Sequence, residues 1–175
     1  MLHIKQSITI LFTIIVCSLQ TNSIETKVYQ NEGKNFEISI PDTWDVKVTQ
    51  KEVYTKQGGW EDFFNKLEVT ATYYEDWGTF RRPVEEELKI GSEDSAFKYQ
   101  NNLKITETDT YIIYSYDLKS PVTSSGNDTV TYRKYEFEFK QKPRDHFTLI
   151  AESYKEFTDE ETRIVDTILA SVKFL

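Results

Sequence analysis

Alternating apolar and polar residues predict β-strands along much of this chain. Residues 36–40 and 44–48 alternate in this way on either side of a break at Pro41, and residues 67–73 and 147–151 repeat the pattern. Because successive side chains of a strand point to opposite faces, a period of two indicates a strand with one buried face.

Two neighbouring runs predict a β-hairpin in the second half of the chain. Residues 111–118 are apolar on both faces, which predicts a central strand that is covered on both sides. Residues 132–140 place aromatic rings on one face and charged side chains on the other. Residues 120–128 between them contain Ser, Pro, Gly and Asn, and they predict the connecting loop of the hairpin.

Two segments predict helices. Thr158 and Glu161 have the spacing of a capping box. The apolar residues that follow share one helical stripe: Ile164, Val165, Ile168, Leu169 and Val172. A second helix is predicted to begin at Pro83, with residues 85–87 as an acidic first turn. This order of strands and helices predicts an α+β fold with a mainly antiparallel sheet.

Both ends of this region resemble a known family. Residues 36–44 (FEISIPDTW) are similar to the F-x-I-x-x-P-x-x-W opening of PsbP-like domains, and residues 164–174 are similar to their final helix and tail. The resemblance implies a three-layer α/β/α sandwich that acts by binding. An extrinsic photosystem II protein, a yeast Ran-binding protein and bacterial DcrB share this fold, so the resemblance does not specify a partner.

The first residues predict a secretory signal peptide. A basic opening that contains Lys5 precedes the apolar run 8–16, and small and polar residues follow. The run is shorter than the roughly 20 apolar residues that a membrane-spanning helix needs. We therefore predict a signal peptide at 1–23 and a single domain at 24–175. The mature protein is expected to be periplasmic or secreted, without a transmembrane segment.

Cys17 offers an alternative to soluble export. Residues 14–17 resemble a bacterial lipobox, but Val16 stands where that motif needs a small residue, so we expect a mature protein without lipid. Cys17 is the single cysteine of the chain. Removal of the signal peptide leaves no cysteine for a disulfide, so burial alone is expected to stabilise the exported domain.

Charge and motif content argue against several classes of function. The chain carries 21 Lys and Arg against 29 Asp and Glu, a formal net charge of −8, which disfavours nucleic acid as a partner. His146 is the only histidine after the signal peptide, too few nitrogen ligands for a usual zinc site. The sequence has no phosphate-binding glycine loop and no nucleophile elbow. We predict no cofactor, no metal and no catalytic site, with His146 as a partly exposed residue at a strand start.

Glu75 and Asp76 beside Trp77 support a competing hypothesis. Carboxylates next to an aromatic ring are typical of sugar-binding sites, and paired carboxylates catalyse glycoside hydrolysis. The alternative is therefore a carbohydrate-binding protein or a carboxylate-dependent, glycoside hydrolase-like protein.

Aromatic and arginine residues in two predicted loops are the best candidates for a binding surface. Trp60, Phe63 and Phe64 lie in one loop, and Trp77 and Arg81 lie in the next. Such residues are typical of interface hot spots, although Trp60 and Phe63 could instead pack beneath the first helix and complete the core. The leading hypothesis is an exported, non-enzymatic binding or accessory protein. Its partner would be an unknown protein or small ligand of the envelope.

Overall fold

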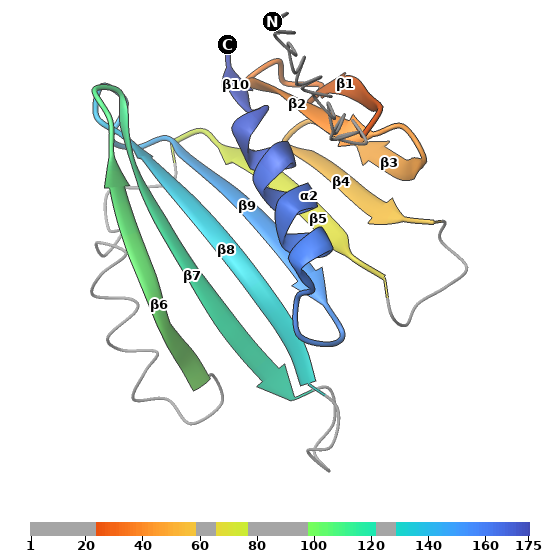
Figure 1. Ribbon diagram of the computed structural model, residues 1–175. Helices are drawn as coiled ribbons and strands as arrows, with labels where there is room; N and C mark the ends of the chain where they lie inside the picture. Colours follow the sequence, from red (N-terminus) through yellow and green to blue (C-terminus); the bar gives the residue numbers. More distant parts are fainter. Residues whose placement is uncertain (1–23, 59–65, 77–97, 122–128) are drawn as a thin grey trace, which may run out of the picture.

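The computed structural model describes residues 24–58, 66–76, 98–121 and 129–175, which form two antiparallel sheets and one helix (Figure 1). The large sheet has the spatial order β3 (Trp44–Val48), β4 (Glu52–Gln57), β5 (Glu68–Tyr74), β9 (His146–Ser153), β8 (Thr129–Phe139), β7 (Tyr111–Pro121) and β6 (Lys98–Glu107). The small sheet has the order β1 (Thr26–Gln30), β2 (Phe36–Pro41) and β10 (Lys173–Phe174). The helix α2 spans Asp159–Ala170.

The alternation of side chains predicts β2, β3, β5, β8 and β9 correctly, and the apolar run at residues 111–118 predicts β7. β7 and β8 pair along their whole length, from Tyr111 opposite Phe139 to Pro121 opposite Thr129, which confirms the hairpin. The pattern does not predict β1, β4, β6 or β10. The predicted α+β class with a mainly antiparallel sheet is confirmed.

The predicted capping box starts α2. The Thr158 hydroxyl accepts the backbone N–H of Glu161 at 3.2 Å, and the Glu161 carboxylate accepts the backbone N–H of Thr158 at 2.8 Å. At the other end, the backbone N–H of Ser39 donates to Ser171 Oγ at 2.8 Å, which ties the C-terminus of the helix to β2. The capping-box bonds satisfy polar groups that a helix leaves unpaired at its N-terminus.

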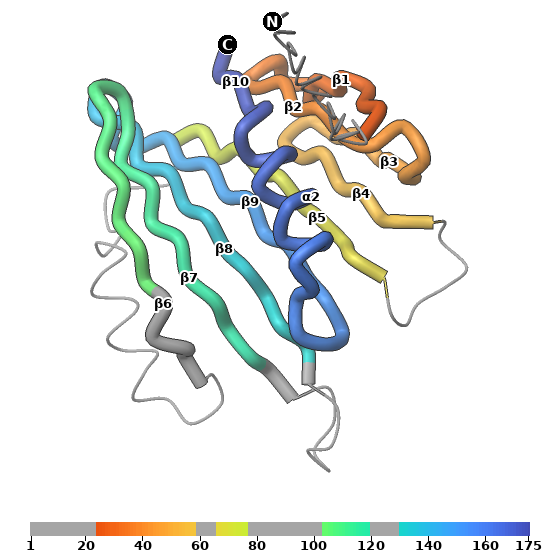
Figure 2. The backbone as a smooth tube through the Cα atoms, in the orientation of Figure 1, coloured from red at the N-terminus to blue at the C-terminus, as the bar shows by residue number. Residues whose placement is uncertain are grey.

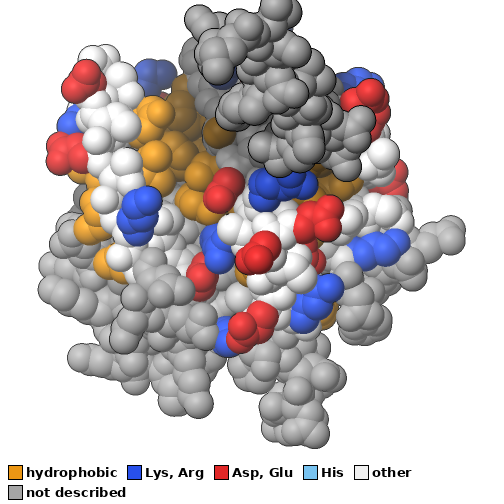
Figure 3. Space-filling view, viewed as in Figure 1, with side chains coloured by type: hydrophobic (Ala, Val, Ile, Leu, Met, Phe, Trp, Pro, Cys, Tyr) orange, Lys and Arg blue, Asp and Glu red, His pale blue; other side chains and the backbone are white. Residues whose placement is uncertain are grey.

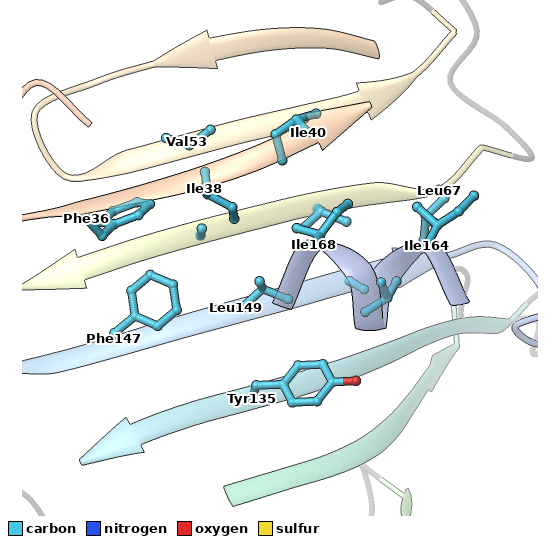
Figure 4. Packing of buried hydrophobic residues seen from close by; sticks show 14 of the residues in the cluster. Phe36, Ile38, Ile40, Val53, Leu67, Tyr135, Phe147, Leu149, Ile164 and Ile168 are labelled. Carbon is cyan, nitrogen blue, oxygen red and sulfur yellow. The ribbon is translucent and has the colours of Figure 1, made fainter. Parts of the chain in front are cut away.

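The core lies between the large sheet on one side and β2 with α2 on the other. Figure 4 shows Phe36 and Ile38 of β2, Leu149 of β9 and Ile168 of α2 in this space. Each of these side chains is at most 1% exposed. Because apolar surface stabilises the fold by about 25 cal/mol per Å² removed from water, this contact provides the main stabilisation of the described residues.

The expectation that His146 is partly exposed is wrong. His146 does begin β9, but only 3% of it is exposed. Its ring lies 6.2 Å from the ring of Tyr74, which stands opposite it on β5. The strand pattern predicts the position of His146 in the sheet, whereas its burial depends on what covers that face of the sheet.

Several predictions fall outside the described residues, among them the signal peptide at 1–23 and the helix from Pro83. The described residues place a helix on one face of the large sheet, so the three-layer arrangement stays a prediction. Within the described residues, no helix combines the length and the apolar character needed to cross a membrane.

Candidate functional site

A cavity of about 680 Å³ lies between α2 and strands β6, β7 and β8, and we call it the α2 groove. Figure 2 shows α2 over β9 and β5, with β8, β7 and β6 continuing beyond the helix. Figure 3 shows hydrophobic side chains at the surface beside the helix on this side. The lining residues are Lys104, Thr106, Tyr111, Ile113, Ser115, Tyr116, Asp117, Arg133, Tyr135, Phe137, Asp166, Leu169, Ala170 and Val172.

One end of the groove is apolar. Ile113 of β7 stands directly opposite Phe137 of β8, and both side chains line the cavity. Leu169 and Val172, from the end of α2 and the residues after it, form the opposite wall. These side chains offer a surface for an apolar group of a ligand.

The ring of Phe174 on β10 packs over this apolar end. Its centroid lies 5.8 Å from that of Tyr111, 5.5 Å from that of Phe137 and 4.7 Å from that of Phe139, each in an edge-to-face arrangement. Such ring contacts add about 0.5–1.5 kcal/mol each beyond the area that they bury. The C-terminal strand therefore holds the apolar end of the groove in place.

The other end of the groove contains an ion pair. Arg133 Nε donates to Asp117 Oδ1 at 2.9 Å, and Nη1 donates to Thr162 Oγ1 of α2 at 3.2 Å. The guanidinium lies 4.9 Å from the ring centroid of Phe157. Burial lowers the pKa of Arg133, but the hydrogen bond and the charge of Asp117 outweigh it and raise the pKa above its ordinary value. The Arg133 guanidinium therefore stays protonated, and the negative charge of Asp117 balances its positive charge.

The middle of the groove is polar on both walls. Lys104 of β6 stands opposite Ser115 of β7, which in turn stands opposite Tyr135 of β8. The Tyr135 hydroxyl donates to Asp166 Oδ1 of α2 at 3.4 Å. Burial, and then the charge of Asp166, raise the pKa of Tyr135 to about 12, so the hydroxyl is a neutral donor at physiological pH.

Among the described lining residues, Lys104 is the charged side chain that makes neither an ion pair nor a side-chain hydrogen bond. Its side chain is exposed, and it forms no ion pair with any residue in the described part of the chain. By contrast, Asp117 pairs with Arg133, and Asp166 accepts a hydrogen bond from Tyr135. Within the described residues, the groove therefore offers the positive charge of Lys104 beside an apolar surface, while the exposed carboxylate of Asp166, which accepts the Tyr135 hydroxyl and forms no ion pair there, lies on α2.

The structure corrects the prediction that residues 111–118 are covered on both faces. Tyr114 and Tyr116, on the face away from α2, are each 7% exposed. On the other face, Tyr111 and Ile113 are only half-buried and line the groove. Ser115 is the next residue on the same face of β7. The change from apolar Tyr111 and Ile113 to polar Ser115 is a sequence pattern from which an open groove could have been predicted.

The binding residues predicted from the sequence do not enter this site. Trp60, Phe63, Phe64, Trp77, Arg81 and Cys17 lie outside the described residues. Glu75 and Asp76 are described and exposed, and neither lines the groove. Glu75 Oε1 accepts a hydrogen bond from Asn35 Nδ2 at 2.7 Å, and Asp76 forms an ion pair with Arg144. Within the described residues, no group of three or more His, Cys, Asp or Glu is placed to hold a metal ion.

Comparison with known proteins bears on the fold. No protein-family model and no curated protein matches the sequence. The Saccharomyces cerevisiae Ran-binding protein Mog1p is similar in structure, with a TM-score of 0.55 and 10% identity over 86% of this chain and 96% of Mog1p. LpqN of Mycobacterium tuberculosis, described as involved in cell envelope biogenesis, has a TM-score of 0.58 and 10% identity over 87% of this chain and 92% of LpqN. The chain therefore has the PsbP-like fold that its opening and closing motifs predict.

Proposed function

We propose that this chain is an exported, non-enzymatic binding protein and that the α2 groove is its binding site. The observation that carries the proposal is the groove itself. Its volume of about 680 Å³ lies within the range of about 300–1,000 Å³ that is usual for ligand sites. An apolar wall with a few polar groups at defined positions is also typical of such sites.

The structural neighbours support this proposal. Mog1p is a Ran-binding protein, and LpqN is described as involved in cell envelope biogenesis. A binding role is suggested by the description of Mog1p, and a place in the envelope by that of LpqN. A place in the envelope also agrees with the predicted signal peptide. The fold hosts different partners, so the ligand of this chain depends on its own groove.

The hydrolase alternative has less support from the described residues. Glu75 and Asp76 are engaged by Asn35 and Arg144 at an exposed position, away from the groove. We infer that this carboxylate pair stabilises the connection between strands. The protein should therefore show no turnover on panels of glycoside and ester substrates. Turnover that disappears in Glu75→Gln or Asp76→Asn would contradict the non-enzymatic role.

The binding site can be tested by blocking the groove. Ala170 is exposed and lines the groove at the end of α2, so Ala170→Trp should fill it. Thr167→Trp is the matched control, because Thr167 is exposed on the same helix and does not line the groove. Native mass spectrometry and proteomic comparison of material that co-purifies from the native envelope would detect small and protein ligands.

A ligand that is retained by the wild type and by Thr167→Trp but lost from Ala170→Trp would support the groove as the site. Equal retention by all three proteins would place binding elsewhere. Circular dichroism would verify that both variants fold.

Export makes a separate prediction. Because Val16 stands where lipidation needs a small residue, the mature protein should begin between residues 19 and 24 and carry no lipid. Intact-mass measurement of the protein from the envelope tests this prediction. A diacylglyceryl group on Cys17 would contradict it and would indicate an anchored protein.

A further inference from the structure

We propose that the α2 groove selects an amphipathic anion, with its apolar chain or ring at the Ile113–Phe137 end and its acidic group on Lys104. This inference rests on the proposed function, because it names the ligand class of the same groove. It follows from the charges of the lining residues and from their order along the strands.

Among the described lining residues, Lys104 is the charged group that no other side chain engages. Arg133 and Asp117 pair with each other, through Nε to Oδ1 at 2.9 Å and Nη2 to Oδ2 at 3.4 Å. Asp166 accepts the Tyr135 hydroxyl. Lys104 has no ion-pair partner in the described part of the chain, so an anionic group can bind it without breaking an existing pair.

The order of residues along the strands sets the length of the ligand. Lys104 stands opposite Ser115, two residues along β7 from Ile113 and on the same face. Strands rise about 3.3 Å per residue, so the Lys104 position lies roughly 7 Å along the strand from the Ile113–Phe137 pair. A molecule with an acidic head and an apolar part of several carbons can therefore contact both positions at once.

A cationic ligand fits the groove less well. Among the described lining residues its partner would be Asp117, which already pairs with Arg133, or Asp166, which accepts the Tyr135 hydroxyl and interacts electrostatically with Arg133. Its charge would also lie near Lys104 and Arg133, and like charges at close range oppose binding. The charge pattern of the groove therefore favours an anion.

The test uses two probes that have the same chain length and opposite charge. Isothermal titration calorimetry would measure the binding of decanoate and of decyltrimethylammonium to the purified protein. Decanoate should bind more tightly. Shortening the chain to octanoate and hexanoate should weaken binding by up to about fourfold per methylene, the factor expected when a buried CH₂ is lost.

Lys104→Gln should weaken decanoate binding about tenfold, because it removes a charge-assisted hydrogen bond. Lys51→Gln is the matched control, since Lys51 is exposed in the turn between β3 and β4 and does not line the groove. Ala170→Trp should abolish decanoate binding. Both lysines are exposed, so neither substitution should affect folding.

The inference would be overturned by equal affinity for both probes, by unchanged affinity in Lys104→Gln, or by decanoate binding that survives Ala170→Trp. Absence of decanoate binding would also overturn it. If Ala170→Trp nevertheless loses a ligand that co-purifies with the wild type, the groove stands as the binding site and only the ligand class is wrong.

Discussion

The two halves of the face of the large sheet that meets α2 have similar side-chain patterns but different surroundings. In the covered half, Val69 of β5 and Leu149 of β9 are at most 1% exposed beneath β2 and α2. In the open half, Tyr111 and Ile113 of β7 are half-buried and line the groove. Alternation therefore shows which side chains share a face, and it does not show whether that face is covered.

The dimensions of the elements explain the difference. A helix is about 10 Å across and neighbouring strands lie about 4.8 Å apart, so one helix covers about two strands. The large sheet has seven strands, and α2 and β2 cover only part of its face. Ser115 and Arg133 line the uncovered part and are only half-buried, so they avoid the full cost of burying polar groups, whereas the buried Asp117 is compensated by its ion pair with Arg133.

Two identical substitutions should separate the halves most strongly. Ile38→Ala, on the strand β2 that covers the first half, should lower the free energy of unfolding by about 2–5 kcal/mol, because it leaves a cavity in the core cluster that contains Leu149 and Ile168. Ile113→Ala in the open half should cost about 1 kcal/mol or less, since its side chain already borders the groove. Denaturant unfolding of both variants tests this prediction, and equal losses would contradict the comparison.

Enlarging an alanine should give a smaller contrast. Ala151 on β9 is fully buried, so Ala151→Leu should destabilise the protein by about 1–3 kcal/mol through overpacking. Ala170 lines the groove and is exposed, so Ala170→Leu should stay within about 0.5 kcal/mol of the wild type. Melting temperatures of the two variants measure this difference. A large loss in Ala170→Leu would mean that the groove lacks the space described.

The smallest expected effect concerns the reverse side of β8, behind the open half. Glu136 is buried there, accepts the Tyr116 hydroxyl at 2.9 Å and forms an ion pair with Lys134. Burial raises the pKa of Glu136, but Lys134, together with His146 and Tyr116, outweighs it and lowers the pKa below the ordinary value of 4.5. Ionised Glu136 therefore contributes stability that is present above about pH 4.5 and is lost as the pH falls through the lowered, folded-state pKa.

Glu136→Gln should remove this part of the pH dependence. Its free energy of unfolding should lie furthest below that of the wild type at neutral pH, and the two should converge as the pH falls below 4.5 and through the lowered, folded-state pKa of Glu136. Urea unfolding over this pH range measures the difference. Parallel curves would show that the ionisation of Glu136 does not contribute to stability.

Local pattern predicted the strands whose alternation is strong, and it failed where the pattern is weak. Residues 36–40 and the capping box at Thr158 have clear local signatures, and both form the predicted elements. The edge strand β6 has mixed polar and apolar residues, with Leu103 and Ile105 exposed, so its sequence lacks the contrast of a half-buried strand. The two residues of β10 become a strand only because they pair with Glu37 and Phe36 of β2.

The candidate site could be predicted less well than the fold. The sequence directed attention to the rings and arginines of predicted loops, because such residues are common in interfaces. The groove instead uses Ile113 and Phe137, which have the pattern of ordinary core residues. Lys104, the lining charge that no described side chain engages, has no local feature that distinguishes it from other surface lysines.

By itself, the sequence determined which side chains share a strand face, where α2 begins and which family the opening and closing motifs resemble. These properties depend on residues that are close together in the chain. The tertiary structure alone decided the strand order, the burial of His146 and the open half of the sheet. These depend on contacts between distant residues, such as Ser39 with Ser171 and Tyr111 with Phe174, and no local pattern records which segments will meet.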